Sequence, residues 1–269
     1  MTKSMNNYAK LLVVTTVSLL LLAGGLVALA DEFDQLTGRE IIKKVYQRDT
    51  YEDRKSSMKM TLINDGGGEK VREIRQFERD FGEVDKKIMV FTAPRDVEGT
   101  SFMNWSYEDD SEDDQWLYMP ALGSIRRIAG GGQSDRFMGS DFTYEDLGER
   151  TLDEDKHKLL REEKLNGKEC YVVESVPREE GYMYSKTITW VSKNNWIGLK
   201  KEFYDPDGEL LKVLRVKDYE EIDEILTVTE SEMHDVQEDH KTLIQLDDIE
   251  FNTGIPERKF TQRTMQRGL

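Results

Sequence analysis

The chain has 269 residues, with 54 acidic and 38 basic side chains and a formal net charge of −16. This length is enough to bury a hydrophobic core in one large domain. The negative charge excludes binding to nucleic-acid phosphates, because no basic face with interleaved aromatic residues compensates it. It also disfavours simple adsorption to anionic membranes.

The first thirty residues predict a secretory signal peptide. Lys3 and Lys10 lie at the start, residues 11–30 are apolar, and a small-x-small pattern ends at Ala30 before the acidic residue Asp31. These are the three parts of a cleavable signal peptide. We therefore predict cleavage between Ala30 and Asp31.

Cleavage would divide the chain into a signal peptide, residues 1–30, and a mature domain, residues 31–269. Loss of the two lysines changes the net charge to −18. An uncleaved signal anchor is the alternative, since the apolar run is long enough to span a bilayer. No cysteine follows the run, which excludes a lipoprotein anchor.

Cys170 is the single cysteine of the chain, so an internal disulfide is excluded. We expect Cys170 to be a buried, inert thiol.

The first predicted element of the mature domain is an amphipathic helix. Thr37 to Glu40 form a capping-box pattern, and Ile41, Ile42 and Val45 then fall on one helical face. We expect this face to lie against an apolar surface.

After this helix, apolar residues alternate with a period of two, which is typical of strands. The predicted strands lie in residues 56–65, 71–79, 86–94, 99–108, 114–122, 168–176, 185–193, 196–205, 209–219, 226–235 and 241–251. Turn sequences such as Asn166-Gly167 and Asp205-Pro206-Asp207-Gly208 separate them. The pattern predicts a mainly β (α+β) domain with one antiparallel meander and a short terminal helix after Pro256.

Large methionine and aromatic side chains recur along the predicted strands. They suit a surface that accepts variable apolar partners, and a sheet core rich in methionine is the alternative interpretation. These large residues, the candidate binding residues, are Met58, Met60, Met89, Phe91, Met103, Trp105, Trp116, Tyr118, Tyr182, Tyr184, Trp190 and Phe203.

Catalytic and metal sites have little support. Gly130 to Gly132 lack the lysine and the following helix of a phosphate-binding loop. The three histidines, His157, His234 and His240, are not next to a nucleophile motif. The acidic run from Glu108 to Asp114 lacks calcium-ligand spacing and predicts a solvated hairpin tip. We therefore predict no catalytic residue, no metal and no cofactor, and an exported hydrolase is the least supported function.

Residues 125–150, IRRIAGGGQSDRFMGSDFTYEDLGER, interleave opposite charges with apolar side chains. We expect the charges to form a local network of ion pairs and hydrogen bonds. The apolar residues Phe137, Met138, Phe142, Tyr144 and Leu147 would turn inward. A cavity lid and a well-packed long loop both fit this pattern.

Three stretches, residues 94–109, 114–147 and 190–212, resemble the signature blocks of the LolA-like outer-membrane lipoprotein-sorting family. The resemblance covers nearly all of the mature chain. Residues of the second block that match the family, and that would form its lid or rim loop, are Arg126, Arg127, Gly139, Ser140, Asp141, Tyr144, Glu145 and Asp146. The resemblance assigns no individual role to any of them.

The resemblance implies an unclosed antiparallel β-barrel: one strongly curved sheet of roughly ten or eleven strands around an apolar cavity, with short lid helices. It also implies a periplasmic carrier of lipoprotein acyl chains or lipids, without catalysis. Implied partners are the acylated cargo, an inner-membrane exporter of the ABC or RND type, and an outer-membrane acceptor. An accessory module that docks on an RND-type (MMPL-like) exporter and carries no cargo is the alternative.

Overall fold

The structure is a computed structural model that describes residues 36–48, 51–109 and 111–268. The predicted signal peptide and its cleavage site lie outside the described residues. The chain divides into two compact units, Met1–Thr37 and Gly38–Leu269. All helices and strands named below belong to the second unit. No helix within the described ranges has the length and apolar character that crossing a membrane requires.

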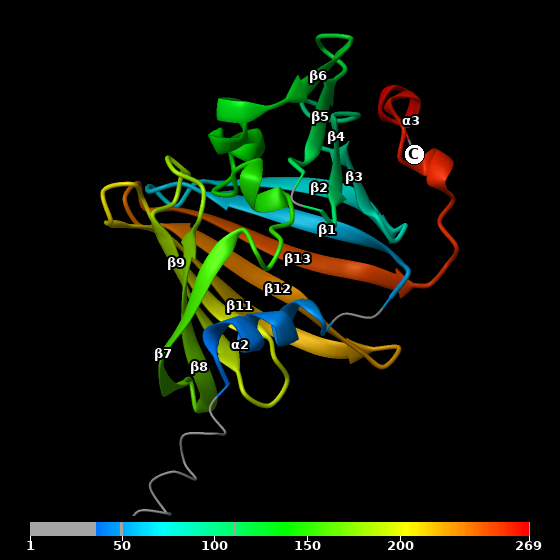
Figure 1. Ribbon diagram of the computed structural model, residues 1–269. Coiled ribbons are helices and arrows are strands. Elements are labelled where there is room, and N and C mark those ends of the chain that lie inside the picture. The colour runs from blue at the N-terminus through cyan, green and yellow to red at the C-terminus, as the bar shows by residue number, and fades with distance from the viewer. Residues whose placement is uncertain (1–35, 49–50, 110, 269) are drawn as a thin grey trace, which may run out of the picture. The chain divides into compact units, whose positions relative to one another are not determined.

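The second unit is built on one antiparallel sheet of 13 strands (Figure 1). In chain order the strands are β1 (Asp53–Ile63), β2 (Glu69–Asp80), β3 (Val84–Ala93), β4 (Ser101–Tyr107), β5 (Asp114–Met119), β6 (Ser124–Ile128), β7 (Asp155–Leu165), β8 (Lys168–Pro177), β9 (Lys186–Ser192), β10 (Gly198–Tyr204), β11 (Leu210–Ile222), β12 (Ile225–Asp235) and β13 (His240–Phe251). The predicted mainly β class and unclosed sheet are confirmed, and the sheet has two strands beyond the eleven predicted segments, β6 and β7.

Strands that follow one another in sequence pair with each other, except β6 and β7, and β1 also pairs with β13. The first and last strands are therefore joined in the middle of the sheet, and the free edges are β6 and β7. These two edges are consecutive in the chain. The segment between them, which contains most of residues 125–150, lies over one face of the sheet (green in Figure 1). We call this face the inner face.

Helices are few. Helix α2 (Gly38–Tyr46) packs on β7 and β8 and buries Ile41 and Ile42, as its amphipathic pattern predicted. A side chain at Gly38 would lie 2.7 Å from the backbone of Leu159 in β7, so only glycine allows this close approach. The C-terminal part contains the 3-10 turn η4 (Glu257–Lys259) and helix α3 (Gln262–Arg267), which contacts β4.

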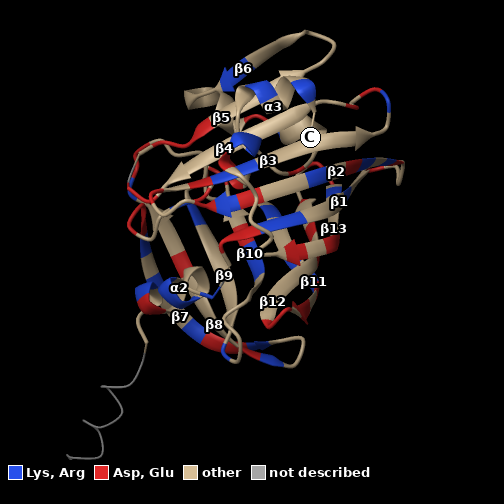
Figure 2. Ribbon diagram, turned by 90° about the vertical axis from the view of Figure 1, so that its right-hand side faces the viewer, with Lys and Arg blue, Asp and Glu red and all other residues tan. Residues whose placement is uncertain are grey.

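The sheet is covered on both faces near β3 and β4. Phe102 faces inward and joins a cluster with Met89, Phe91 and Phe137. Met103, the next residue, faces the opposite way and packs with Phe260 and Met265 of the C-terminal part. Alternation along a strand sends neighbouring side chains to opposite faces, and both faces of this region are buried. Figure 2 shows that charged residues lie along the strands as well as in the loops.

Candidate functional site

The signature segment, residues 125–150, packs into the inner face through its aromatic residues. Phe137 is fully buried, and its ring lies 5.4 Å from that of Phe102 and 5.9 Å from that of Phe91. Tyr144 joins the same cluster. Between them the 3-10 turn η2 (Phe137–Gly139) brings the backbone into the left-handed region at Met138 (φ 50°) and Gly139 (φ 78°). Glycine tolerates this conformation, which explains why it stands at the reversal.

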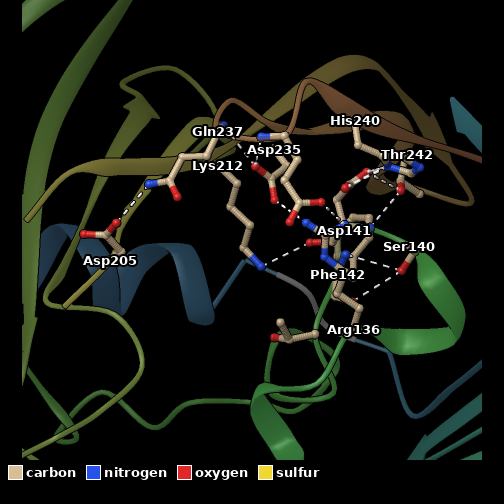
Figure 3. Close-up of polar contacts among 12 residues, drawn as sticks. Arg136, Ser140, Asp141, Phe142, Asp205, Lys212, Asp235, Gln237, His240 and Thr242 are labelled. Atoms are coloured by element: carbon tan, nitrogen blue, oxygen red, sulfur yellow. Dashed lines mark hydrogen bonds and ion pairs between the residues drawn. The ribbon is translucent and has the colours of Figure 1, made fainter. Parts of the chain in front are cut away.

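Asp141 attaches the segment to β13 (Figure 3). Its carboxylate lies 2.9 Å from Nδ1 of His240 and accepts a hydrogen bond of 2.7 Å from the hydroxyl of Thr242. Its backbone N–H donates to the same hydroxyl oxygen at 2.9 Å. Asp141 is buried. A buried carboxylate requires such partners, because an unsatisfied one is costly.

Asp146 attaches the segment to β11 and to the loop before β9. It forms an ion pair with Lys212, and both side chains are almost fully buried, 6% and 3% exposed. Lys212 also donates to the carbonyl of Asp141 at 3.1 Å. The carboxylate of Asp146 accepts a hydrogen bond of 2.9 Å from the hydroxyl of Tyr184. Burial and this neighbouring charge raise the pKa of Tyr184, so the tyrosine remains a hydrogen-bond donor.

Arg136 forms the third attachment, to β12 and the turn after it. It binds Asp235 at 2.5 Å and Glu238 at 2.9 Å. The predicted local network therefore needs a correction: the segment's principal ion pairs join it to strands β11 to β13. The exposed Arg127 pairs with Asp114 of the neighbouring strand, and Arg126 is also exposed. The buried contacts fix the middle of the segment against the sheet.

A cavity of about 820 Å³ lies beside the attached segment on the inner face, and we call it the inner cavity. One part of its wall is apolar, because Tyr184, Phe203 and Met233 form a buried cluster with which Phe142, Tyr182 and Leu214 pack. All six of these residues line the cavity. Polar residues of the opposite part include Asp85, Lys87, Asn104 and Ser106. The lining is thus amphiphilic, which corrects the expectation of a uniformly apolar cavity.

The charged side chains that line the inner cavity differ in whether a group of opposite charge lies next to them. Arg150 pairs with Asp155 at 2.7 Å and with Glu145 at 3.4 Å, and its guanidinium lies 4.2 Å from the centre of the Tyr182 ring. Burial raises the pKa of Glu145. Burial and the nearby carboxylate of Glu149 raise the pKa of Asp85 to about 7. The carboxyl group of Asp85 therefore changes charge near neutral pH.

The twelve candidate lipid-binding residues do not share one surface. Tyr182, Tyr184 and Phe203 line the inner cavity. Met58, Met60, Met89 and Phe91 belong to the inner cluster under the signature segment. The others pack in two further clusters: Met103, Trp105, Trp116 and Tyr118 beneath the C-terminal part, and Trp190 with Cys170 and Val172. The prediction of a single face is wrong. Side chains alternate between the two faces along each strand, and the register of β3 and β4 pairs Met89 with Phe102 and Ile88 with Met103. Met89 and Met103 therefore lie on opposite faces of the sheet. A role of these residues in lipid binding stays a prediction.

One serine–histidine pair lies at the cavity wall. Oγ of Ser175, which lines the inner cavity, is 2.8 Å from Nδ1 of His157, and the other ring nitrogen is 3.0 Å from the carbonyl oxygen of Leu152. Burial lowers the pKa of His157. Sequence spacing gave no sign of this pair, because the two residues lie on neighbouring strands β7 and β8. The described residues contain no group of three or more side chains suited to hold a metal ion.

Together these features define an unclosed antiparallel β-barrel with an inner cavity and a covering segment. Comparison with solved structures gives the same class. A DUF1329 family protein from Desulfovibrio piger is 31% identical, with a TM-score of 0.81, over 85% of this chain and 97% of that one. A putative outer membrane lipoprotein-sorting protein domain from Vibrio parahaemolyticus is 35% identical, with a TM-score of 0.81, over 86% and 98%. A LolA superfamily protein from Nitrosomonas europaea, 20% identical with a TM-score of 0.68 over 85% and 99%, shares the fold.

A family model described as that of an uncharacterized protein matches residues 83–267. The chain belongs to the DUF1329 family, and its fold is that of the LolA superfamily. The resemblance to LolA-like lipoprotein-sorting proteins is thereby confirmed. None of the curated proteins matches this sequence.

Proposed function

We propose that this protein is a periplasmic carrier that holds the acyl chain of a lipid or lipoprotein in the inner cavity and shuttles it towards the outer membrane. The observation that supports this function is the cavity of about 820 Å³ with an apolar wall beside the attached signature segment. Its volume lies in the usual range of ligand cavities, roughly 300–1,000 Å³. The lipoprotein-sorting name of the Vibrio parahaemolyticus relative supports the same function.

Burial of apolar surface supplies the affinity in this mechanism. Each methylene group removed from water contributes about 0.8 kcal/mol. Ten buried methylenes would then contribute about 8 kcal/mol, which corresponds to a dissociation constant near 1 µM before ordering costs are subtracted. Burial has no direction of its own, so transfer requires an acceptor with higher affinity or a rearrangement of the wall. An inner-membrane exporter of the ABC or RND type would supply the cargo, and an outer-membrane acceptor would receive it.

Gentle-ionisation mass spectrometry tests the proposal. The protein is purified without detergent from cells that contain membranes, and its mass is measured under native and denaturing conditions. A discrete additional mass that extracts into organic solvent supports the carrier and identifies the class of cargo. A mass without addition, also after incubation with phospholipid vesicles, would contradict the carrier. The accessory module of an RND-type exporter would then be tested by capture of a transporter with the unloaded protein.

A further inference from the structure

Lys201 of β10 lines the inner cavity at its apolar wall. It faces Leu214 of β11 across the strand pair, and its ammonium group lies 5.1 Å from the centre of the Phe203 ring. Phe203 is buried and its ring lies 5.1 Å from that of Tyr184. A cationic group thus lies beside the aromatic and aliphatic side chains of this wall, to which Thr187 and Ser175 add hydroxyl groups.

Among the described residues, no carboxylate forms an ion pair with Lys201. The acidic groups whose charges act on it most strongly are Asp146 and Asp155. Asp146 is engaged by Lys212, and Asp155 by Arg150 at 2.7 Å. Within the described part of the chain, Lys201 is therefore a cation of this wall without a counter-ion. Burial lowers its pKa, as expected for an ammonium group that is desolvated without a partner.

A charge held at an apolar wall without a partner is unfavourable in the empty protein and becomes favourable when a ligand supplies the opposite charge. We infer that the inner cavity binds a single-chain amphiphile with an anionic headgroup, and that Lys201 binds this headgroup while the chain lies along Phe203, Leu214 and Met233. This inference rests on the proposed carrier function and narrows its cargo. A carboxylate and a phosphate share the required chemistry, so a free long-chain carboxylate and a lysophospholipid are its two sources.

The test compares three ligands with the same chain: oleate, oleoyl lysophosphatidate and the uncharged oleyl alcohol. Each displaces the neutral apolar dye N-phenyl-naphthylamine from the protein at ligand concentrations below micelle formation. The unmodified protein should bind at least one of the two anionic ligands about tenfold or more tightly than the alcohol, because hydrogen bonds to a charged group in a partly desolvated site are strong. The anionic ligand with the higher affinity identifies the source.

Two variants and one control isolate Lys201. Lys201→Met should remove the preference for the anionic ligand without weakening binding of the alcohol, and Lys201→Arg should retain the preference. Lys200→Met is the matched control, since Lys200 pairs with Glu202 at 2.6 Å and lies 4.0 Å from the Trp190 ring in a separate cluster. It should leave all three affinities unchanged. Thermal unfolding of each variant verifies that the fold is intact.

The outcomes separate this inference from the function on which it rests. Equal affinity for the alcohol and both anionic ligands would overturn the role of Lys201 and leave the carrier function intact. A preference that survives Lys201→Met in a folded protein would also overturn it. Failure of all three ligands to displace the dye would contradict the carrier function itself.

Discussion

Asp146 connects two parts of the structure through one carboxylate: it pairs with the buried ammonium group of Lys212 and accepts a hydrogen bond of 2.9 Å from Tyr184. Lys212 belongs to β11, Tyr184 lines the inner cavity, and Asp146 belongs to the signature segment. The covering segment and the cavity wall therefore share one buried ion pair. A change at this pair acts on both.

Lys212→Met should destabilise the fold by about 3–5 kcal/mol, because it leaves the carboxylate of Asp146 buried without its cation. Urea unfolding followed by tryptophan fluorescence measures the free energy of unfolding. Lys217→Met on the same strand is the control: Lys217 pairs with Glu232 at 3.3 Å at the surface, and its loss should cost less than about 1 kcal/mol. Equal effects of the two variants would show that the buried pair does not hold the segment.

The carboxyl group of Asp85 should make stability depend on pH. Burial and the nearby acids Glu149, Asp80 and Glu108 raise its pKa from the ordinary value of 3.8 to about 7, and Lys87 partly opposes this effect. The folded state therefore keeps the proton to a higher pH than the unfolded state, so the free energy of unfolding falls as pH rises from about 4 to about 7. Asp85→Asn removes this contribution.

The gain in stability from Asp85→Asn should thus be small near pH 4 and largest above pH 7. Its upper limit is about 4 kcal/mol, and solvent screening at this half-buried site reduces it. Urea unfolding of both proteins at several pH values measures the difference. Parallel pH profiles of the two proteins would show that Asp85 ionises normally in the fold.

Leu214→Trp should fill part of the inner cavity and weaken binding of an apolar ligand about tenfold or more, since the added ring occupies space that the chain needs. Displacement of N-phenyl-naphthylamine measures the affinity. Arg215→Trp adds the same ring to the opposite face of β11, where Arg215 lies 4.0 Å from Glu232, and should not change it. Unchanged binding in folded Leu214→Trp would place the ligand elsewhere.

Ser175 and His157 are expected to have a structural role. Their contact of 2.8 Å joins β7 to β8 at the cavity wall, and the carrier mechanism uses no nucleophile. Turnover of p-nitrophenyl esters by the purified protein should equal that of Ser175→Ala, measured from the absorbance of p-nitrophenolate. Turnover that vanishes on this substitution would make the protein a hydrolase.

The alternation of apolar residues was sufficient to predict eleven of the thirteen strands, and it failed at the two sheet edges. β6 is short and carries Arg126 and Arg127, so its pattern does not predict a strand. β7 contains the charged run LLREEK, with residues that favour helices, and its pattern lacks clear alternation. An edge strand has a partner on one side only and is less constrained by burial. Prediction was therefore weakest where the barrel is open.

The candidate site was predictable in part. The pattern predicts that the apolar residues of the signature segment turn inward, and the burial of Phe137 and Tyr144 confirms this. The residues that bind it, Lys212, Asp235 and His240, lie about 70 to 100 positions away in sequence, and only the three-dimensional pairing brings them together. Similarly, the pattern could not show that Met89 and Met103 face opposite ways, because this depends on strand register.

Because the edges β6 and β7 do not pair, the sheet does not close into a complete barrel. The ladder is continuous from β6 through the β1–β13 pair to β7. Separation of β6 from β7 would therefore break no hydrogen bond between strands, but it would disturb the contacts of the intervening segment with the sheet. A closed barrel has a circumference set by its strand number and stagger. An unclosed sheet is free of this constraint, so in the proposed carrier the width of the opening is limited by the intervening segment and not by strand pairing.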